Sequence, residues 1–142
     1  MTGRGIAERW GRGGKAMGGT PQDARFDEVL ARLREIGLMD EPSLLAETAE
    51  LFLTDADSMV NQMKDAFAGG DAHALRESSH RLKGAALNLG FTVLAEPAKA
   101  IEERAKRGEF AGTPESLTQL ETELIRVGAW LRQVASAPHP PS

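Results

Sequence analysis

Apolar residues recur at helical spacing along most of this chain, and this periodicity constrains the fold more than any other feature. Five segments show the pattern, and most are bounded by residues that start or stop helices, such as Thr-Pro pairs and glycines. No segment alternates apolar and polar residues as a half-buried strand would. The sequence therefore predicts an all-α fold, with helices over about 20–36, 42–67, 72–89, 91–107 and 113–135.

Short connections join the last four segments, which favours an antiparallel up-and-down four-helix bundle. The first segment is shorter, and we expect it to pack as an extra N-terminal helix. The bundle domain is expected over residues 20–135, between a flexible Gly/Arg-rich tail (1–19) and a disordered proline-rich C-terminal tail (136–142). Pro97 falls in the second turn of the fourth helix, where it predicts a bend rather than a break.

Composition and charge exclude several classes of function. The 142 residues include no cysteine, so the chain has no disulfide framework, thiolate metal site or cysteine nucleophile. Its three histidines are too scattered for a zinc site. The net charge is −4, of which residues 1–20 contribute +3 and the remainder −7, so the folded part is not expected to bind nucleic acid. An alternative for the basic tail is an arm that binds nucleic acid or an acidic partner.

No apolar run reaches the roughly 20 residues that a transmembrane helix needs. The N-terminus also lacks the continuous apolar stretch of a secretory signal. We therefore expect a soluble, cytoplasmic protein that does not bind membranes.

The segment His80-Arg81-Leu82-Lys83-Gly84 carries the main candidate for chemistry. Positions i, i+3 and i+4 of a helix share a face, so His80, Lys83 and Gly84 should form one surface patch. The apolar stripe of the same helix places His80 on the solvent side. That stripe consists of Leu75, Leu82 and Leu89.

These neighbours suit a histidine that accepts a phosphoryl group. Lys83 can balance the negative charge that develops on the phosphate. Gly84 costs about 1 kcal/mol relative to alanine inside a helix, and its missing side chain allows another protein to approach closely. A metal site would need a ligand at i+3 or i+4, where the chain has lysine and glycine. No pattern of paired carboxylates accompanies His80, so acid–base catalysis is not indicated.

The run His80-x-x-Lys83-Gly84, followed by Asn88-Leu89-Gly90, resembles the signature of histidine-containing phosphotransfer (HPt) domains of bacterial multistep phosphorelays. The resemblance covers about residues 24–134 and extends to further short matches. These are Leu51-Phe52-Leu53, Gly70-Asp71 and Leu75-Arg76. A departure from the pattern is that Ala85 and Ala86 stand where a serine is frequent.

The resemblance implies that His80 accepts phosphate from the phosphoaspartate of one receiver domain and donates it to another. Lys83 is then the charge-stabilising neighbour, and Gly84 provides clearance for the partner. The implied partners are response-regulator receiver domains and a hybrid sensor histidine kinase, and the Mg²⁺ needed for transfer is expected to belong to the receiver. No cofactor or metal of its own is expected.

The chain is accordingly expected to be a phosphocarrier and not an enzyme, because it has no ATP-binding glycine-rich boxes. We also expect a monomer. Leu87, Leu53 and Val60 are candidate partner-binding residues, with ordinary bundle packing as the alternative for each. The second helix has an apolar stripe about 200° wide, which indicates either neighbours on two sides or one exposed docking edge.

Two other functions remain open at the level of the sequence. One is a phosphate-independent helical adaptor that binds receiver or kinase domains, and the other is a histidine kinase fragment. His73 serves as an internal comparison, because it lies seven residues before His80 and on nearly the same helix face. Its i+3 and i+4 neighbours are Arg76 and Glu77, so we expect an exposed, structural histidine.

Overall fold

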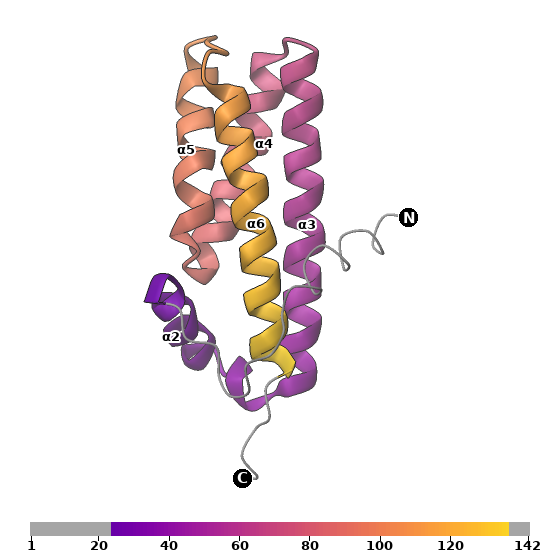
Figure 1. The fold of residues 1–142 in the computed structure, drawn as a ribbon, viewed down its shortest axis with the longest axis vertical. Coiled ribbons are helices and arrows are strands. Elements are labelled where there is room, and N and C mark those ends of the chain that lie inside the picture. The colour runs from indigo at the N-terminus through magenta and orange to yellow at the C-terminus, as the bar shows by residue number, and fades with distance from the viewer. Residues whose placement is uncertain (1–23, 137–142) are drawn as a thin grey trace. The chain divides into compact units, whose positions relative to one another are not determined.

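The computed structural model describes residues 24–136, and every regular element within that range is helical (Figure 1). The all-α prediction is therefore confirmed. The helices are η1 (Ala24–Phe26), α2 (Asp27–Glu35), η2 (Leu38–Asp40), α3 (Pro42–Ala68), α4 (Ala72–Leu89), α5 (Thr92–Lys106) and α6 (Thr113–Ser136). The last four agree with the predicted bounds to within one residue at either end. Ser136, predicted as the first residue of the C-terminal tail, is the last residue of α6. The rest of the predicted tails and the Thr20-Pro21 helix start lie outside the described residues.

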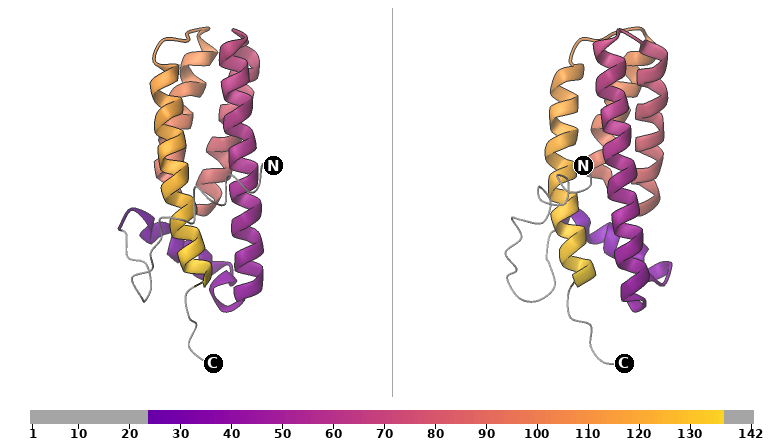
Figure 2. Two further views of the ribbon diagram at one scale, coloured as in Figure 1. Left: turned by 45° about the vertical axis from the view of Figure 1, so that its right-hand side comes forward. Right: turned by 90° about the vertical axis from the view of Figure 1, so that its right-hand side faces the viewer.

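The chain divides into two compact units. The bundle unit is Asp55–Leu124, which combines the second half of α3, all of α4 and α5, and the first half of α6. Within this unit the four segments run alongside one another in each view, as a four-helix bundle (Figures 1 and 2). The terminal unit contains the described residues 24–54 and 125–136.

One apolar stripe from each segment builds the core of the bundle unit. The α5 stripe that the sequence predicted is buried throughout, whereas Leu89 of α4 is only half-buried. The buried set contains Ala56, Val60, Met63, Ala66, Leu75, Leu82, Ala86, Leu94, Ala98, Ile101, Ala105, Leu117, Leu120 and Leu124. Each large aliphatic side chain in such a set contributes roughly 1.5–3 kcal/mol through removal from water. The core therefore holds all four segments together.

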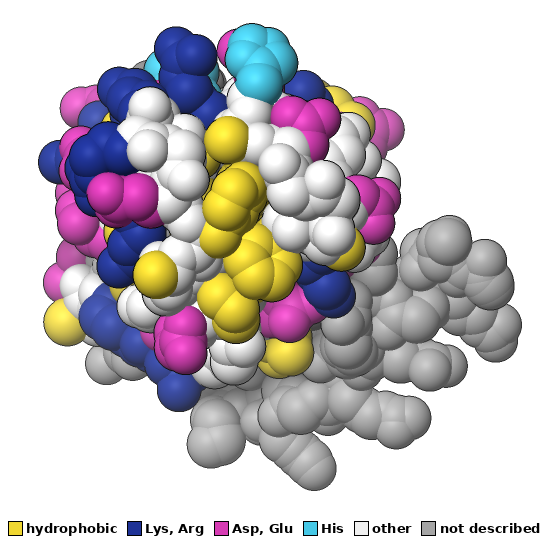
Figure 3. All heavy atoms as spheres, turned by 90° about the horizontal axis from the view of Figure 1, so that it is seen from above, with side chains coloured by type: hydrophobic (Ala, Val, Ile, Leu, Met, Phe, Trp, Pro, Cys, Tyr) yellow, Lys and Arg dark blue, Asp and Glu magenta, His cyan; other side chains and the backbone are white. Residues whose placement is uncertain are grey.

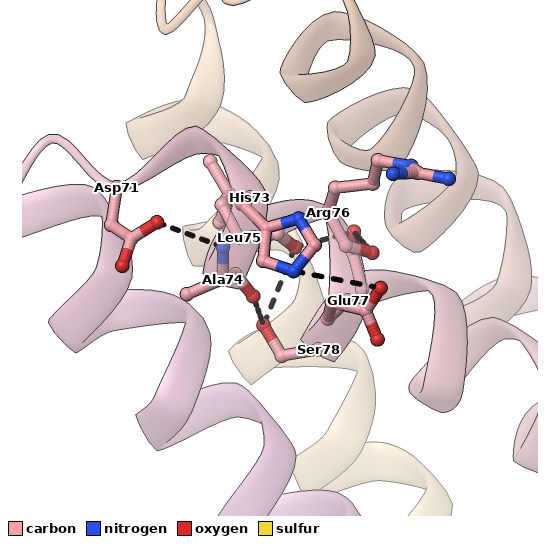
Figure 4. A network of polar contacts seen from close by, with 8 residues as sticks. Asp71, His73, Ala74, Leu75, Arg76, Glu77 and Ser78 are labelled. Atoms are coloured by element: carbon pink, nitrogen blue, oxygen red, sulfur yellow. Dashed lines mark hydrogen bonds and ion pairs between the residues drawn. The ribbon is translucent and has the colours of Figure 1, made fainter.

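Two capped ends fix the position of α4 along the bundle. At its start the Asp71 carboxylate accepts a hydrogen bond from the Ala74 backbone N–H at 3.0 Å (Figure 4). At its end Gly90 adopts a φ of +86°, and the Phe91 N–H donates to the Ala86 carbonyl at 2.8 Å. These caps are the start and stop that the sequence predicted.

Contacts at the loop end of the bundle unit join segments that are distant in sequence. Figure 3 looks onto the end that carries the α3–α4 and α5–α6 connections, where apolar side chains form a central patch with basic side chains to one side. Phe67 and Phe110 meet edge to face, with 6.1 Å between ring centroids. Lys64 of α3 pairs with Glu121 of α6 at 2.7 Å.

Helix α5 continues through Pro97 without a break.

The terminal unit has its own core, to which the predicted extra N-terminal helix, α2, contributes Val29 and Leu33. The rings of Phe26 and Trp130 lie 4.8 Å apart in this core. On α3, Leu44 and Leu51 are 48% and 64% exposed, so the wide apolar stripe of this helix has an exposed edge within the terminal unit. No helix within residues 24–136 has the length and apolar character needed to cross a membrane.

Candidate functional site

His80 lies on α4 with its side chain 65% exposed, as the helical pattern predicted. The two residues before it point inward. Ser79 is fully buried, and its hydroxyl donates to the Leu75 carbonyl at 2.7 Å. Ser78 is also buried and donates to the Ala74 carbonyl at 2.8 Å. The helix thus buries these two serines with their hydroxyl hydrogen bonds satisfied and keeps the imidazole at the surface.

A carboxylate from the neighbouring helix lies against the imidazole. Glu102 of α5 has only 5% of its side chain exposed, and its Oε2 is 2.8 Å from His80 Nδ1. The other oxygen, Oε1, is 2.7 Å from Lys83 Nζ. One buried carboxylate therefore contacts both the histidine and the lysine of the predicted patch.

The electrostatics of this cluster keep Glu102 ionised. Burial alone would raise the pKa of Glu102, but hydrogen bonds from Lys83 and His80 and their positive charges outweigh it, so the pKa lies below its usual 4.5. An ionised carboxylate can only accept hydrogen bonds. It follows that Nδ1 of His80 carries a proton and donates a hydrogen bond to Glu102 Oε2. In the neutral ring, Nε2 then holds the lone pair and is the nucleophilic nitrogen.

Lys83 and Gly84 complete the exposed surface around His80. The Lys83 side chain is 25% exposed and spans from its own helix to α5. Gly84 is exposed, and a β-carbon added there would meet no heavy atom within 4 Å. Its φ is not positive, so neither backbone conformation nor internal packing requires glycine at this position. The surface beside His80 is therefore open to a close approach from outside.

The sequence matches the Hpt domain family over residues 47–130. The chain belongs to this family. Its structure is similar to the crystal structure of histidine-containing phosphotransfer protein B (HptB) from Pseudomonas aeruginosa PAO1, with 35% sequence identity and a TM-score of 0.67. That similarity covers 77% of this chain and 91% of the HptB chain. No curated protein matches the sequence.

Family membership gives this Hpt protein its general role, which is histidine phosphotransfer in two-component phosphorelays. It also confirms the resemblance that the His80–Gly90 signature suggested and the helical bundle fold that was expected from it.

The structure brings three predicted site residues together, places Leu87 next to them and buries the other two candidates. His80, Lys83 and Gly84 share the exposed patch, and Leu87, one further turn along α4, is 46% exposed. By contrast, the prediction that Leu53 and Val60 contact a partner is wrong.

Leu53 and Val60 are 0% and 2% exposed, so neither can offer a surface to another protein. Each belongs to the apolar stripe that α3 turns into the core of its own unit. The width of that stripe in the sequence did not distinguish its buried edge from its exposed one. The exposed edge carries Leu44 and Leu51 instead.

Sequence reasoning found no carboxylate for His80 and so missed Glu102. A signal was available, because Glu102 stands four residues after Ala98 and three before Ala105, within the apolar stripe of α5. A charged residue at a buried stripe position is rarely tolerated without a partner. That partner could not be named from the sequence, because it depends on how α4 and α5 align across their contact.

Proposed function

We propose that His80 accepts a phosphoryl group from the phosphoaspartate of one receiver domain and passes it to the aspartate of a second. The observation that carries this proposal is the exposed imidazole whose Nδ1 is held 2.8 Å from a buried, ionised carboxylate. This contact directs the Nε2 lone pair to the reaction and fixes the ring orientation. We therefore assign Nε2 as the phosphorylated atom.

Each transfer is a substitution at phosphorus. In the first, Nε2 forms a bond to phosphorus while the bond to the carboxylate oxygen of the donor receiver breaks, and that oxygen keeps the electron pair. In the second, an aspartate of the acceptor receiver attacks phosphorus and the P–N bond breaks. The electron pair of that bond returns to Nε2, so this chain supplies the nucleophile of the first transfer and the leaving group of the second. The Mg²⁺ that neutralises the phosphoryl charge belongs to the acidic site of each receiver.

Lys83 and Gly84 act on the same step in different ways. The Lys83 ammonium lies one turn from His80 and can contact a phosphoryl oxygen while it keeps its pairing with Glu102. Gly84 leaves open space beside the imidazole, where the receiver's active site must approach. Leu87 extends this surface by one turn and supplies exposed apolar contact area for the receiver.

The proposed setting follows from the family's role in phosphorelays. A hybrid sensor histidine kinase, through its receiver domain, is the proposed phosphate source, and a response regulator is the destination. In this proposal the chain acts as a cytoplasmic monomer and has no autokinase activity of its own. Its solved relative is named as a histidine-containing phosphotransfer protein, which supports the same class of role.

Labelling with two phosphate donors tests this function. Incubation with ATP and Mg²⁺ alone should leave the protein unlabelled, whereas a phosphorylated receiver domain should transfer label to His80. The label should be acid-labile and alkali-stable, as expected for a phosphoramidate bond, and His80→Gln should abolish it. Acid-stable, alkali-labile label would place the phosphate on another residue and overturn the proposal. Receiver binding without any label would instead support the helical adaptor.

A further inference from the structure

The carboxylate of Glu102 is positioned to control a proton that the phosphotransfer chemistry depends on. Its Oε2 contacts Nδ1 of His80 at 2.8 Å, on the opposite side of the ring from the nitrogen assigned to phosphate. With 3% of the residue exposed, water has little access to this carboxylate. Low solvent access strengthens an ionic hydrogen bond, so the contact should persist when the charge on the ring changes.

Phosphorylation of Nε2 makes the state of Nδ1 decisive for the next step. If Nδ1 carries a proton, the ring is a cation and leaves phosphorus as neutral imidazole when the P–N bond breaks. If Nδ1 has lost that proton, the ring must leave as an imidazolate anion, which is a far poorer leaving group. The fate of one proton therefore decides whether phosphohistidine is a ready donor or an inert one.

We propose that Glu102 is a positioning residue that keeps Nδ1 of phosphorylated His80 protonated, and thereby keeps the phosphoryl group transferable at neutral and mildly alkaline pH. This inference rests on the proposed phosphorylation of His80. The proton balance is simple, because Nδ1–H is present in the free ring, in the phosphorylated ring and after transfer. Neither transfer then requires a proton to enter or leave the site. The carboxylate stays anionic throughout.

Some charged groups around the ring oppose its positive charge, and one favours it. Lys83, on α4, opposes a cationic ring, but its ammonium contacts the second oxygen of Glu102, and a phosphoryl group on Nε2 attracts it further. Arg76 lies one turn before His80 on α4, and Lys99 and Lys106 lie one turn before and after Glu102 on α5, all exposed. Screening by water weakens the exposed charges. The buried carboxylate at 2.8 Å is therefore the dominant charge at Nδ1.

The pH dependence of phosphate loss in matched variants tests this inference. The full chain would be charged with phosphoramidate, a small donor that needs no receiver, and loss of phosphate to water would be followed by phosphorus NMR across a range of pH. In the wild type, fast loss should extend into alkaline pH. In Glu102→Gln, the midpoint of the profile should fall by about one to three pH units, as for loss of an adjacent opposite charge. At a pH between the two midpoints, Glu102→Gln should lose phosphate more slowly than the wild type, by about tenfold for each pH unit above its own midpoint.

Glu103→Gln is the matched control, because it removes the same charge from the next residue, which is exposed. Its profile should coincide with that of the wild type. Identical profiles for Glu102→Gln and the wild type would overturn this inference and leave the proposed function standing. If phosphoramidate labelled another residue and not His80, the proposed function would fail and this inference with it.

A measurement on the wild type keeps the test independent of how Glu102→Gln folds. Nitrogen-15 NMR of the isotope-labelled, phosphorylated protein reports directly whether Nδ1 of His80 carries a proton. The same phosphorylated chain unfolded in urea supplies the reference. Nδ1 should stay protonated in the folded protein at pH values where the unfolded chain has lost the proton. Titration at the same pH in both states would contradict the proposed role of Glu102.

Discussion

Two histidines on α4, seven residues apart, show what separates a reactive site from an ordinary surface. His73 and His80 are similarly exposed, at 77% and 65%, and each has a basic residue at i+3 and a glutamate within reach. The glutamates differ. Glu77 belongs to the same helix as His73, is 56% exposed and lies 4.0 Å away (Figure 4). Glu102 comes from α5, is 5% exposed and lies 2.8 Å from its histidine.

The comparison shows that helical spacing alone does not make the site. An exposed i, i+4 pair contributes little and leaves the histidine free to rotate, because water competes for both partners. A buried carboxylate held by a second helix fixes the ring nitrogen that it contacts and keeps its charge. The difference between the two histidines therefore lies in the packing of α4 against α5. Three pairs of variants and two substitutions of Gly84 test that difference.

The largest expected difference is in phosphate labelling, between the variant that lacks the His80 ring and the variant that lacks the His73 ring. His80→Gln should abolish acid-labile labelling by a phosphorylated receiver, because no other described side chain has the same protonated Nδ1 and outward Nε2 arrangement. His73→Gln should accept label at the wild-type rate. Radiolabel transfer followed by gel electrophoresis measures both. Residual label in His80→Gln at the wild-type level would show that the comparison concerns the wrong residue.

The next largest difference is in stability, between substitution of Glu102 and substitution of Glu77. Glu102→Gln should lower the free energy of unfolding by about 1–3 kcal/mol at neutral pH, because the ion pair with Lys83 and the hydrogen bond from His80 lose the carboxylate charge. Glu77→Gln should change it by less than about 0.5 kcal/mol. Urea unfolding followed by circular dichroism measures both values.

The pH dependence of that stability has a defined sign. Because the pKa of Glu102 is lower in the folded protein than its usual 4.5, ionised Glu102 stabilises the fold above that value. This stabilisation is lost as pH falls through the lowered folded value. The gap between the wild type and Glu102→Gln should therefore be widest near neutral pH and narrow in acid. A gap that stayed constant into strong acid would show that Glu102 contributes through shape rather than charge.

The basic residues at i+3 should give a smaller contrast. Lys83→Gln should slow transfer from a receiver by roughly tenfold, less than loss of a fully dedicated transition-state donor, because Glu102 already shares its charge. Arg76→Gln should leave the rate within about twofold, because exposed charges are screened. Single-turnover kinetics under identical salt conditions would separate the two. Equal losses would mean that general positive charge, and not the position of Lys83, assists the transfer.

The sequence predicted the fold of this chain well because the relevant signals are local. Asp71 and Gly90 cap α4 through contacts within a few residues, and such contacts can be read directly from a chain. The exposure of His80 followed from its angle to Leu75 and Leu82 on one helix. These features require no knowledge of which helix lies beside which.

The parts that the sequence did not predict all depend on packing between helices. Glu102 is 22 positions after His80 in sequence, and only the alignment of α4 with α5 brings the two side chains together. Leu53 was assigned to a partner surface because the apolar stripe of α3 is wide, but packing buries it completely. A pattern on one helix gives the angle of a side chain, and the neighbouring helices decide whether that angle is exposed.

The smallest contrast concerns the residue four positions after each histidine, which is Gly84 for His80 and Glu77 for His73. Glycine at this helical position costs about 1 kcal/mol relative to alanine, and no heavy atom within 4 Å of an added β-carbon explains it. Gly84→Ala should therefore raise the free energy of unfolding by about 1 kcal/mol. Thermal or urea unfolding measures this gain.

The functional counterpart uses a larger side chain at the same position. Gly84→Gln should fold at least as stably as the wild type, yet accept phosphate more slowly from a receiver domain, because the added side chain occupies the approach to His80. Charging by phosphoramidate, a donor of only a few atoms, should be unaffected. Equal slowing with both donors would mean that the substitution disturbs His80 itself. A slower rate with the receiver alone would show that the stability cost of Gly84 is retained to give a partner room to approach His80. The residue at the same position relative to His73 is Glu77, which leaves no such space.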